Sequence, residues 1–518
     1  MPLIPLRASE DATEKARPQA GLRERARDAA LLLGFFALAF LTLGYHPGFE
    51  DDGVYLAAVE WRVHRELFPR DARFFSLQLQ ATIFDRFLAA WVRLTHLSVA
   101  WSELLWQCVA MVTILAAARA ILRRCFASSR AQWAGVAMLG GMFALPVSGT
   151  ALYILDQHLH PRALATALIL LAVVCVMDGR RWRAAACLTG AFLFHPIMGA
   201  LGVSFCFFLL LARSGRLDWM IGARVGTERR ISARAAAVAV PLGWVFEPPT
   251  RAWRAALGTR TYYFLFQWKW YEWLGALAPI LLFWLLGRWA RRRENLPLAR
   301  LSVAVVAYAV AQQSVAIAMA APRELIRLTP LQPMRYLHLV YVLLTMMAGA
   351  LAGEFLLSAK SWRWVVYLAL IYGGMYASQR TIFAATAHIE WPGVASGNEW
   401  VQAFAWIRAH TPEDAYFAVD PWYLEAPGED FHNFRALTER SVLADAVKDA
   451  AVCTQVPELA DEWLRERDAQ TGLDQFSLAQ MERLKATTGA DWALLRYPAR
   501  AGLDCRWHNR VLTVCRIP

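Results

Sequence analysis

Long apolar stretches recur along most of this chain, and they constrain its fold more than any other feature. A helix that crosses a bilayer needs about 20 mostly apolar residues, and fewer when it is packed inside a bundle. We place such segments near residues 29–45, 97–118, 133–155, 163–178, 184–194, 197–212, 235–247, 274–288, 300–320, 338–357 and 363–380. The sequence therefore predicts a mainly α-helical, polytopic membrane bundle with about eleven spans.

The composition supports this class and excludes others. Hydrophobic residues make up 57% of the 518 residues and charged residues only 19%, whereas soluble proteins carry roughly 25% charged residues. The net charge of +12 would suggest nucleic acid as a partner of a soluble protein. Residues 395–518, however, hold 13 Lys+Arg against 19 Asp+Glu, so the positive excess belongs to the membrane part. We expect membrane lipids as partners and no nucleic acid.

The distribution of Lys and Arg predicts the orientation of the chain. If residues 1–28 form a cytoplasmic segment, the loops expected inside are richer in Lys and Arg than those expected outside, as the positive-inside rule requires. No small-residue cleavage pattern follows Tyr45, so the first span is interpreted as a retained signal anchor. The expected location is a bacterial inner membrane, crossed many times, with the C-terminus in the periplasm.

The chain divides into a membrane domain at 29–394 and a small α/β domain at 395–518. In the membrane domain, Phe74–Leu94 is amphipathic and is expected to lie in the membrane interface. His195-Pro196 interrupts the apolar run 184–212, because proline disfavours helix in the residue before it. We therefore expect two short helices there, beside a cavity that opens to the outside.

In the C-terminal domain, helical spacing behind Asn398 predicts a helix, and we interpret Tyr416–Val419 and Trp492–Arg496 as strands. A hairpin is expected to turn at His508-Asn509. Cys453, Cys505 and Cys515 lie in this domain. At most one disulfide can form among the three, and the sequence does not decide which pair forms it.

Three consecutive acids, Glu50, Asp51 and Asp52, follow the first span and are the strongest polar signal. Adjacent carboxylates repel one another unless a cation, arginines or open solvent stabilises them. We interpret the three as candidate catalytic residues; the alternative is a solvated loop. Asp71, further along the same outer loop, is a candidate substrate-binding residue.

A second signal is Asp156-Gln157-His158-Leu159-His160-Pro161-Arg162, between the third and fourth spans. Asp156 and His158 could bind a divalent metal such as Mg or Mn. His160 and Arg162 are candidate substrate contacts, since Arg binds phosphate well. The alternative for the whole motif is structural pairing.

Two later outer loops supply arginine and aromatic residues. In 248–273, Arg260 and Trp268 stand among many aromatic side chains, and Arg335 lies among prolines at the entry to a span. Arginine can bind a lipid phosphate, and an aromatic ring can stack on a sugar. The alternative for the aromatic residues is a belt at the membrane interface, and the alternative for Arg335 is a side chain that extends to the lipid headgroups. No Walker, GxSxG or HExxH motif is present.

This arrangement resembles the GT-C superfamily of polyprenyl-phosphate-dependent glycosyltransferases, and more closely an uncharacterised bacterial branch of it. The resemblance rests on the span number, the acidic motif of the first outer loop, the interfacial helices, the outer C-terminal domain, and the segments Trp406–Ala415 and Phe434–Arg440. It implies a membrane glycosyltransferase that moves a hexosyl or pentosyl group from a lipid-linked sugar donor to an acceptor. Asp51 or Asp52 would be the base, and His158 stands where metal-dependent members carry an acid.

Two other functions stay open at this point. One is a non-enzymatic transporter or flippase for a lipid-linked anion, which would use the arginines but not the acids. The other is an assembly subunit that docks a protein partner through Arg435, Glu439 and Arg440 of the C-terminal domain. Those three residues could equally form structural ion pairs within the chain.

Overall fold

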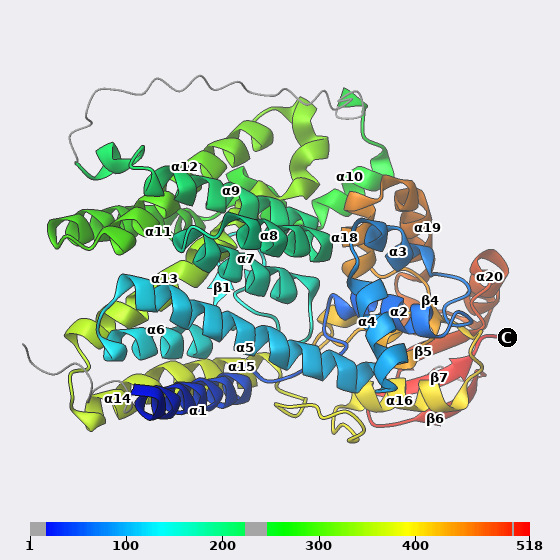
Figure 1. The fold of residues 1–518 in the computed structure, drawn as a ribbon. Helices are drawn as coiled ribbons and strands as arrows, with labels where there is room; N and C mark the ends of the chain where they lie inside the picture. The colour runs from blue at the N-terminus through cyan, green and yellow to red at the C-terminus, as the bar shows by residue number, and fades with distance from the viewer. Residues whose placement is uncertain (1–16, 223–245, 500–501) are drawn as a thin grey trace, which may run out of the picture.

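A computed structural model describes residues 17–222, 246–499 and 502–518. Figure 1 shows a large group of helices at one end of the molecule and the C-terminal domain at the other. The helices of the bundle are α1 (Arg17–Leu43), α5 (Val99–Cys125), α6 (Ser129–Gly141), α7 (Pro161–Met177), α8 (Arg181–Phe194), α9 (Pro196–Arg213), α11 (Trp270–Arg292), α12 (Leu296–Ala320), α13 (Tyr336–Phe355), α14 (Ser361–Leu368) and α15 (Gly374–Ile382).

Six helical segments of the described residues are long and apolar enough to cross a membrane. They are Arg23–Leu43, Val99–Cys125, Pro196–Arg213, Trp270–Arg292, Leu296–Ala320 and Arg323–Phe355. The other expected segments are shorter helices (α6, α7, α8) or a helix broken by a π-helical turn at Ala369–Gly373 (α14 and α15). The expected span at 235–247 lies almost wholly outside the described residues. The chain is a mainly helical membrane bundle with a small C-terminal sheet domain.

The expected break at His195-Pro196 is confirmed. α8 ends at Phe194 and α9 begins at Pro196, where a proline at the first helical position is tolerated because its missing N–H would have no partner anyway. The Nδ1 atom of His195 accepts a hydrogen bond from the backbone N–H of Met198 and so caps α9. One apolar run thus becomes two helices with a polar turn between them.

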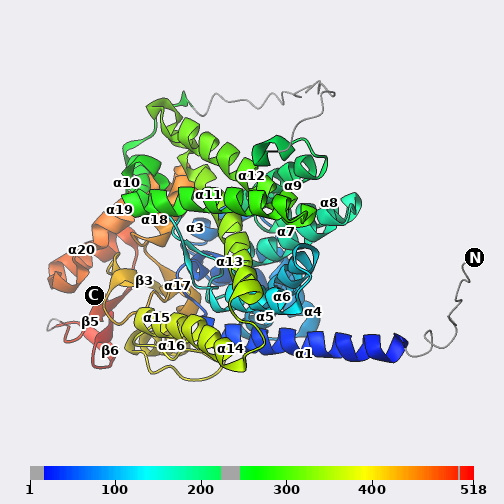
Figure 2. The same ribbon diagram turned by 90° about the vertical axis from the view of Figure 1, so that its left-hand side faces the viewer.

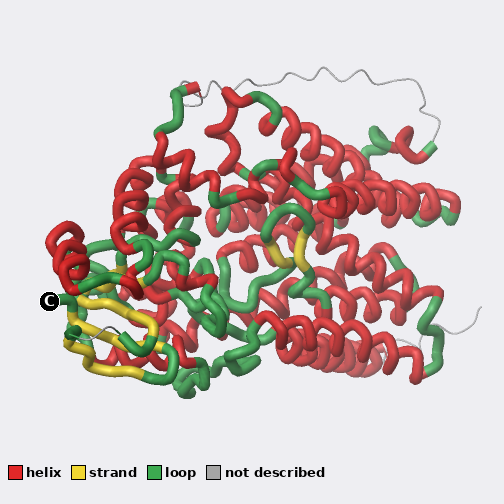
Figure 3. Tube along the Cα trace, turned by 180° about the vertical axis from the view of Figure 1, so that it is seen from behind, coloured by secondary structure: helices red, strands yellow, loops and turns green. Residues whose placement is uncertain are grey.

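The expected span at 133–155 is wrong in its second half. α6 ends at Gly141, and the chain continues into a short antiparallel pair, β1 (Pro146–Val147) and β2 (Leu152–Tyr153), seen as the isolated strands of Figure 3. Gly149 makes the turn with a φ of +65°, and a Cβ there would come within 2.4 Å of the Trp268 ring. The apolar residues of this segment are buried by protein, which composition alone does not distinguish from burial in lipid.

Short helices fill the loop after α1: α2 (Asp52–Val63), α3 (Arg73–Ser76), η1 (Gln78–Ala81) and α4 (Phe84–Thr95). Between α9 and α13 stand α10 (Arg251–Gly258), η4 (Thr261–Tyr263), η5 (Leu265–Gln267), η6 (Arg323–Leu331) and η7 (Pro333–Arg335). Figures 1 and 2 place α3 and α10 beside the C-terminal domain, so loops of the bundle form the contact with it.

The C-terminal domain is a five-stranded sheet with helices around it. Its strands are β3 (Tyr416–Val419), β4 (Ser441–Val442), β5 (Trp492–Arg496), β6 (Asp504–His508) and β7 (Leu512–Arg516), in the order β4-β3-β5-β7-β6. β3 pairs in parallel with β4 and β5, and β7 pairs antiparallel with β5 and β6. Its helices are α16 (Glu399–His410), α17 (Phe434–Thr438), α18 (Lys448–Gln455), α19 (Ala460–Gln470) and α20 (Leu478–Thr488).

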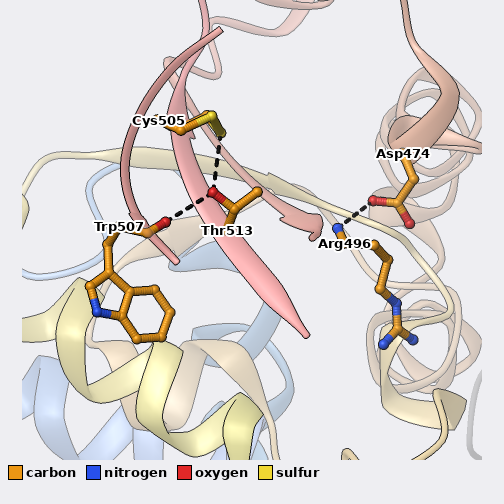
Figure 4. Close-up of a disulfide and its surroundings, with 6 residues drawn as sticks. Asp474, Arg496, Cys505, Trp507 and Thr513 are labelled. Atoms are coloured by element: carbon orange, nitrogen blue, oxygen red, sulfur yellow. Dashed lines mark hydrogen bonds between the residues drawn. A yellow bond between two sulfur atoms is a disulfide. The ribbon is translucent and has the colours of Figure 1, made fainter. Parts of the chain in front are cut away.

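The structure confirms the local predictions made for this domain. The side chain of Asn398 caps α16, whose apolar face is buried in the core of the domain. Of the open disulfide pairings, Cys505–Cys515 forms between neighbouring strands, and Cys453 is free and buried. Figure 4 shows the disulfide beside Thr513, whose hydroxyl donates to the carbonyl oxygen of Trp507.

A buried group of three charges joins the C-terminal domain to the bundle. Arg435 of α17 donates from Nε to Asp71, at 2.6 Å, and from its other two nitrogens to Asp449, at 3.1 and 3.2 Å. All three side chains are almost fully buried. Glu439 pairs instead with Arg408, and Arg440 donates to backbone carbonyls. The three residues considered for partner docking are therefore engaged within the chain.

We expect Arg435→Gln to lower the free energy of unfolding by about 3–5 kcal/mol, because it leaves two buried carboxylates without a partner. Arg408→Gln is the matched control. It breaks an ion pair whose arginine is 54% exposed, and such pairs contribute about 0–1 kcal/mol. The apparent unfolding midpoint of the detergent-purified chain measures both. Equal midpoints for the two variants would contradict the role given to Arg435.

Candidate active site

A cavity of about 1110 Å³ lies where the loops of the bundle meet the C-terminal domain. Its wall is formed by the loop after α1, the β1–β2 pair, the turn before α7, the α8–α9 turn, the loop from α10 to η5, the entry to α13, and α18. Eight of the candidate residues line it: Glu50, Asp51, Asp156, His158, His160, Arg162, Arg260 and Arg335. Three others do not: Asp52, Asp71 and Trp268.

Asp51 is the carboxylate best placed for chemistry. Its side chain is 38% accessible, although the surrounding loop is largely buried, so it faces the cavity. The Nζ atom of Lys448 lies 3.0 Å from one of its oxygens and His160 Nε2 lies 3.5 Å from the other. Burial raises the pKa of Asp51, but Lys448 and His160 outweigh burial and hold that pKa well below its usual range. Asp51 is therefore an ionised carboxylate that is accessible from the cavity.

His160 is oriented by the helix that it caps. The backbone N–H of Arg162 donates to His160 Nδ1, at 2.9 Å, so the ring proton is on Nε2, the atom facing Asp51. Burial lowers the pKa of His160 and nearby Arg162 lowers it further, so the ring is neutral. His160 is thus a neutral donor that fixes the direction of the Asp51 carboxylate.

Asp52 has a different position from its neighbour. It is 1% exposed, and one carboxylate oxygen accepts the backbone N–H of Gly48 at 2.7 Å. Burial, followed by the nearby Glu103, raises the pKa of Asp52 well above its usual range. Its other oxygen lies 3.7 Å from His158 Nε2, so Asp52 ties the loop that presents Asp51 to the turn before α7. Of the two aspartates considered for the base, only Asp51 reaches the cavity.

The proposed metal ligands already have partners or are strongly desolvated. One guanidinium nitrogen of Arg162 lies 2.6 Å from each carboxylate oxygen of Asp156. Burial lowers the pKa of His158 to about 3, and its ring nitrogens are buried without a hydrogen-bond partner. Because a cation of the chain already neutralises Asp156, this pair does not fit a site for a divalent metal.

Two arginines in the wall have no acidic partner among the described residues. Arg260 is 7% exposed and hydrogen bonds through Nε to the hydroxyl of Thr259. The Nε atom of Arg335 is buried without a hydrogen-bond partner. Arg335 as a whole is half-buried. A guanidinium that is partly or largely removed from water and has no counter-ion favours an anionic ligand. The rest of the lining includes Tyr55, Tyr153, Tyr262 and Tyr263, together with apolar side chains and further polar ones such as Arg327 and Glu272.

Lys448 is the functional residue that the sequence analysis missed. Its Nζ atom lies 2.7 Å from Glu50 as well as 3.0 Å from Asp51, and the side chain is 9% exposed. Burial opposes its charge, but the two acids raise its pKa above the ordinary value. One signal was present: the chain has five lysines among 54 basic residues, and this one lies in the acidic domain.

Comparisons with known proteins say little about function. The family described as "Domain of unknown function (DUF6798)" matches residues 398–467, the segment from α16 to α19 that contains Arg435 and Lys448. No curated protein matches the chain. Among solved structures, it is similar to the archaeal oligosaccharyltransferase AglB from Archaeoglobus fulgidus, solved with an inhibitory peptide and a dolichol-phosphate. That match has 11% identity and a TM-score of 0.33, and covers 91% of this chain and 70% of the other.

We expect Arg260→Gln and Arg335→Gln each to weaken binding of an anionic ligand, for which a polyprenyl phosphate serves as the probe. A lost hydrogen bond to a charged group costs roughly 1.5–3 kcal/mol, which raises Kd on the order of ten- to a hundredfold. Quenching of tryptophan fluorescence in detergent measures the binding. Arg254→Gln, on the exposed face of α10, is the matched control, and a polyprenol without phosphate tests the role of charge. Unchanged Kd values in both cavity variants would refute the anion site.

Proposed function

We propose that this protein is a membrane glycosyltransferase that moves a sugar from a polyprenyl-phosphate donor to an acceptor hydroxyl. One observation carries the proposal: an ionised, accessible carboxylate, Asp51, and two arginines without acidic partners, Arg260 and Arg335, line the same cavity. A base and an anion site in one chamber are what transfer from a sugar phosphate requires.

Asp51 and the two arginines have different roles in the proposed reaction. Asp51 accepts the proton of the acceptor hydroxyl as the oxygen attacks the anomeric carbon. The bond between that carbon and the phosphate oxygen breaks, and the phosphate leaves with the electron pair. Arg260 and Arg335 stabilise the negative charge that develops on it. Attack opposite the leaving group inverts the anomeric centre, and the products are the glycosylated acceptor and the polyprenyl phosphate.

Lys448 takes the place that a divalent metal would occupy between two first-loop acids. Its ammonium group lies within 3.0 Å of both Glu50 and Asp51 and neutralises their repulsion without an added cation. His160 fixes the other oxygen of Asp51. The base is thus held by groups of the chain itself.

The outer face of a bacterial inner membrane is the proposed location of the reaction. The Lys+Arg bias of the loops supports it. The Cys505–Cys515 disulfide also supports it, because disulfides persist in the periplasm and are rare in the cytosol.

We expect Asp51→Asn to reduce transfer by about 10²–10⁴-fold, the usual contribution of a general base. Asp52→Asn is the matched control. Its amide oxygen still accepts the Gly48 N–H, so we expect transfer close to wild type. Transfer of radiolabelled sugar from a panel of polyprenyl-phosphate monosaccharides to membrane acceptors provides the measurement. If Asp51→Asn keeps full transfer, the assigned base is wrong. If neither the wild type nor any variant transfers sugar, and Asp51→Asn still transports the lipid phosphate, the protein is a flippase.

We expect Lys448→Ala to shift the acid limb of the pH–rate profile to higher pH. Lys448 is the largest influence lowering the pKa of Asp51, and burial raises that pKa once the lysine is gone. Because the base acts only when ionised, activity is then lost at a higher pH as the solution is acidified. Rates measured across the acidic range test this.

The same variant tests the replacement of a metal. Wild-type transfer should not increase with added Mg²⁺ or Mn²⁺, whereas Lys448→Ala should regain rate when millimolar Mn²⁺ fills the gap between Glu50 and Asp51. Lys485→Ala, the other lysine of the domain, should match wild type in both measurements. A wild-type rate that depends on added metal would contradict the proposed role of Lys448.

A further inference from the structure

A second group of polar side chains lies outside the cavity wall, at the junction of three segments. His46 follows α1, Glu390 belongs to the linker between α15 and α16, and His432 precedes α17. His46 Nδ1 lies 2.8 Å and His432 Nε2 lies 2.9 Å from the same oxygen, Oε1 of Glu390. One nitrogen of each imidazole and one carboxylate oxygen lie within 4.8 Å of one another.

Both imidazole rings are held in place by contacts outside this group. His432 Nδ1 lies 2.9 Å from the carbonyl oxygen of Glu429, so its Nε2 faces Glu390. The His46 ring stacks on Phe383, with ring centroids 3.6 Å apart. A histidine whose second nitrogen bonds to a backbone carbonyl has the arrangement typical of a metal ligand.

Hydrogen bonds alone can hold this group together only if one of the two histidines is charged. For both rings to donate to Glu390, His432 must carry a proton on each nitrogen, because its Nδ1 already faces a carbonyl oxygen. The remaining nitrogen of His46, Nε2, is buried without a partner. Both histidine side chains are fully buried, so without a metal the arrangement needs a charged imidazolium away from water, with the Glu390 carboxylate as its counter-ion.

We propose that His46, Glu390 and His432 bind a structural transition-metal ion, with Zn²⁺ as the ion that best suits two imidazoles and one carboxylate. Binding replaces the N–H protons that face Glu390 with bonds from His46 Nδ1 and His432 Nε2 to the metal. The proton of His46 moves to its Nε2 atom, so that the ring stays neutral, and the proton released from His432 goes to solvent. A water or the second oxygen of Glu390 completes the coordination.

The position of the site indicates what the metal stabilises. The residues next to His432 pair with the loop that carries the acids: Phe431 accepts the N–H of Glu50 at 2.8 Å, and Asn433 donates to Gly48 at 2.7 Å. Glu390 likewise donates its backbone N–H to Tyr45. A metal here fixes the loop after α1 against the linker and the C-terminal domain, and takes no direct part in chemistry at Asp51.

The test uses the full chain, purified in detergent and exposed to Zn²⁺ before desalting. Elemental analysis should find about one Zn²⁺ per chain, and a strong chelator should lower the apparent unfolding midpoint until Zn²⁺ is returned. His432→Gln and Glu390→Gln should lose the ion. His388→Gln should keep it, because this neighbouring histidine contacts the carbonyl of Leu41 and not Glu390.

Co²⁺ gives a second measurement that needs no variant. The wild-type chain loaded with Co²⁺ should show visible d–d absorption bands that Zn²⁺ abolishes. A wild-type chain that retains no Zn²⁺ and shows no Co²⁺ bands would overturn the proposal and leave the group as a hydrogen-bonded clamp. Because no readout here is sugar transfer, this outcome is independent of the proposed transferase.

Discussion

Backbone pairing of the segment Tyr45–Glu50 is the constraint on which the rest of the site depends. Tyr45 pairs with the linker at His388 and Glu390, and His46 donates to Gln157 of the second loop at 2.8 Å. Further on, the same segment pairs with residues 431–433 of the C-terminal domain. Because these bonds involve the main chain, they fix the path of the loop whatever the side chains do. The direction of Asp51 follows from that path.

Charge balance inside the cavity supports the proposal that the site binds an anion. Glu50 and Asp51 share Lys448, and Asp156 is matched by Arg162. Arg260 and Arg335 are then left without an acid among the described residues. A buried charge is costly unless it is paired, so the cavity is most stable when an anionic ligand joins those arginines. The acids that dominate the sequence motif therefore do not make the site acidic overall.

Local features of the fold could be predicted from the sequence, because they depend on neighbours in the chain. The helix break at His195-Pro196, the Asn398 cap and the strands of the C-terminal domain all follow from propensity and spacing. The error at 133–155 arose because buried loops and lipid-facing helices have the same apolar composition. The pairing partners could not be predicted: Asp51 meets Lys448 and Asp71 meets Arg435, each more than 300 residues away. Only the three-dimensional fold brings such residues together.

The C-terminal domain forms part of the proposed active site rather than being an appendage of the bundle. It supplies Lys448 to the first-loop acids, Arg435 to the buried charge group at Asp71, and His432 to the junction with Glu390. Each contact crosses from this domain to a segment of the membrane domain or its linker. If the domain moved away, Glu50 and Asp51 would lose their cation and repel each other. The same contacts that hold the domain in place therefore also keep Asp51 ionised, so the stability of the interface and the ionisation of the proposed base depend on one set of interactions.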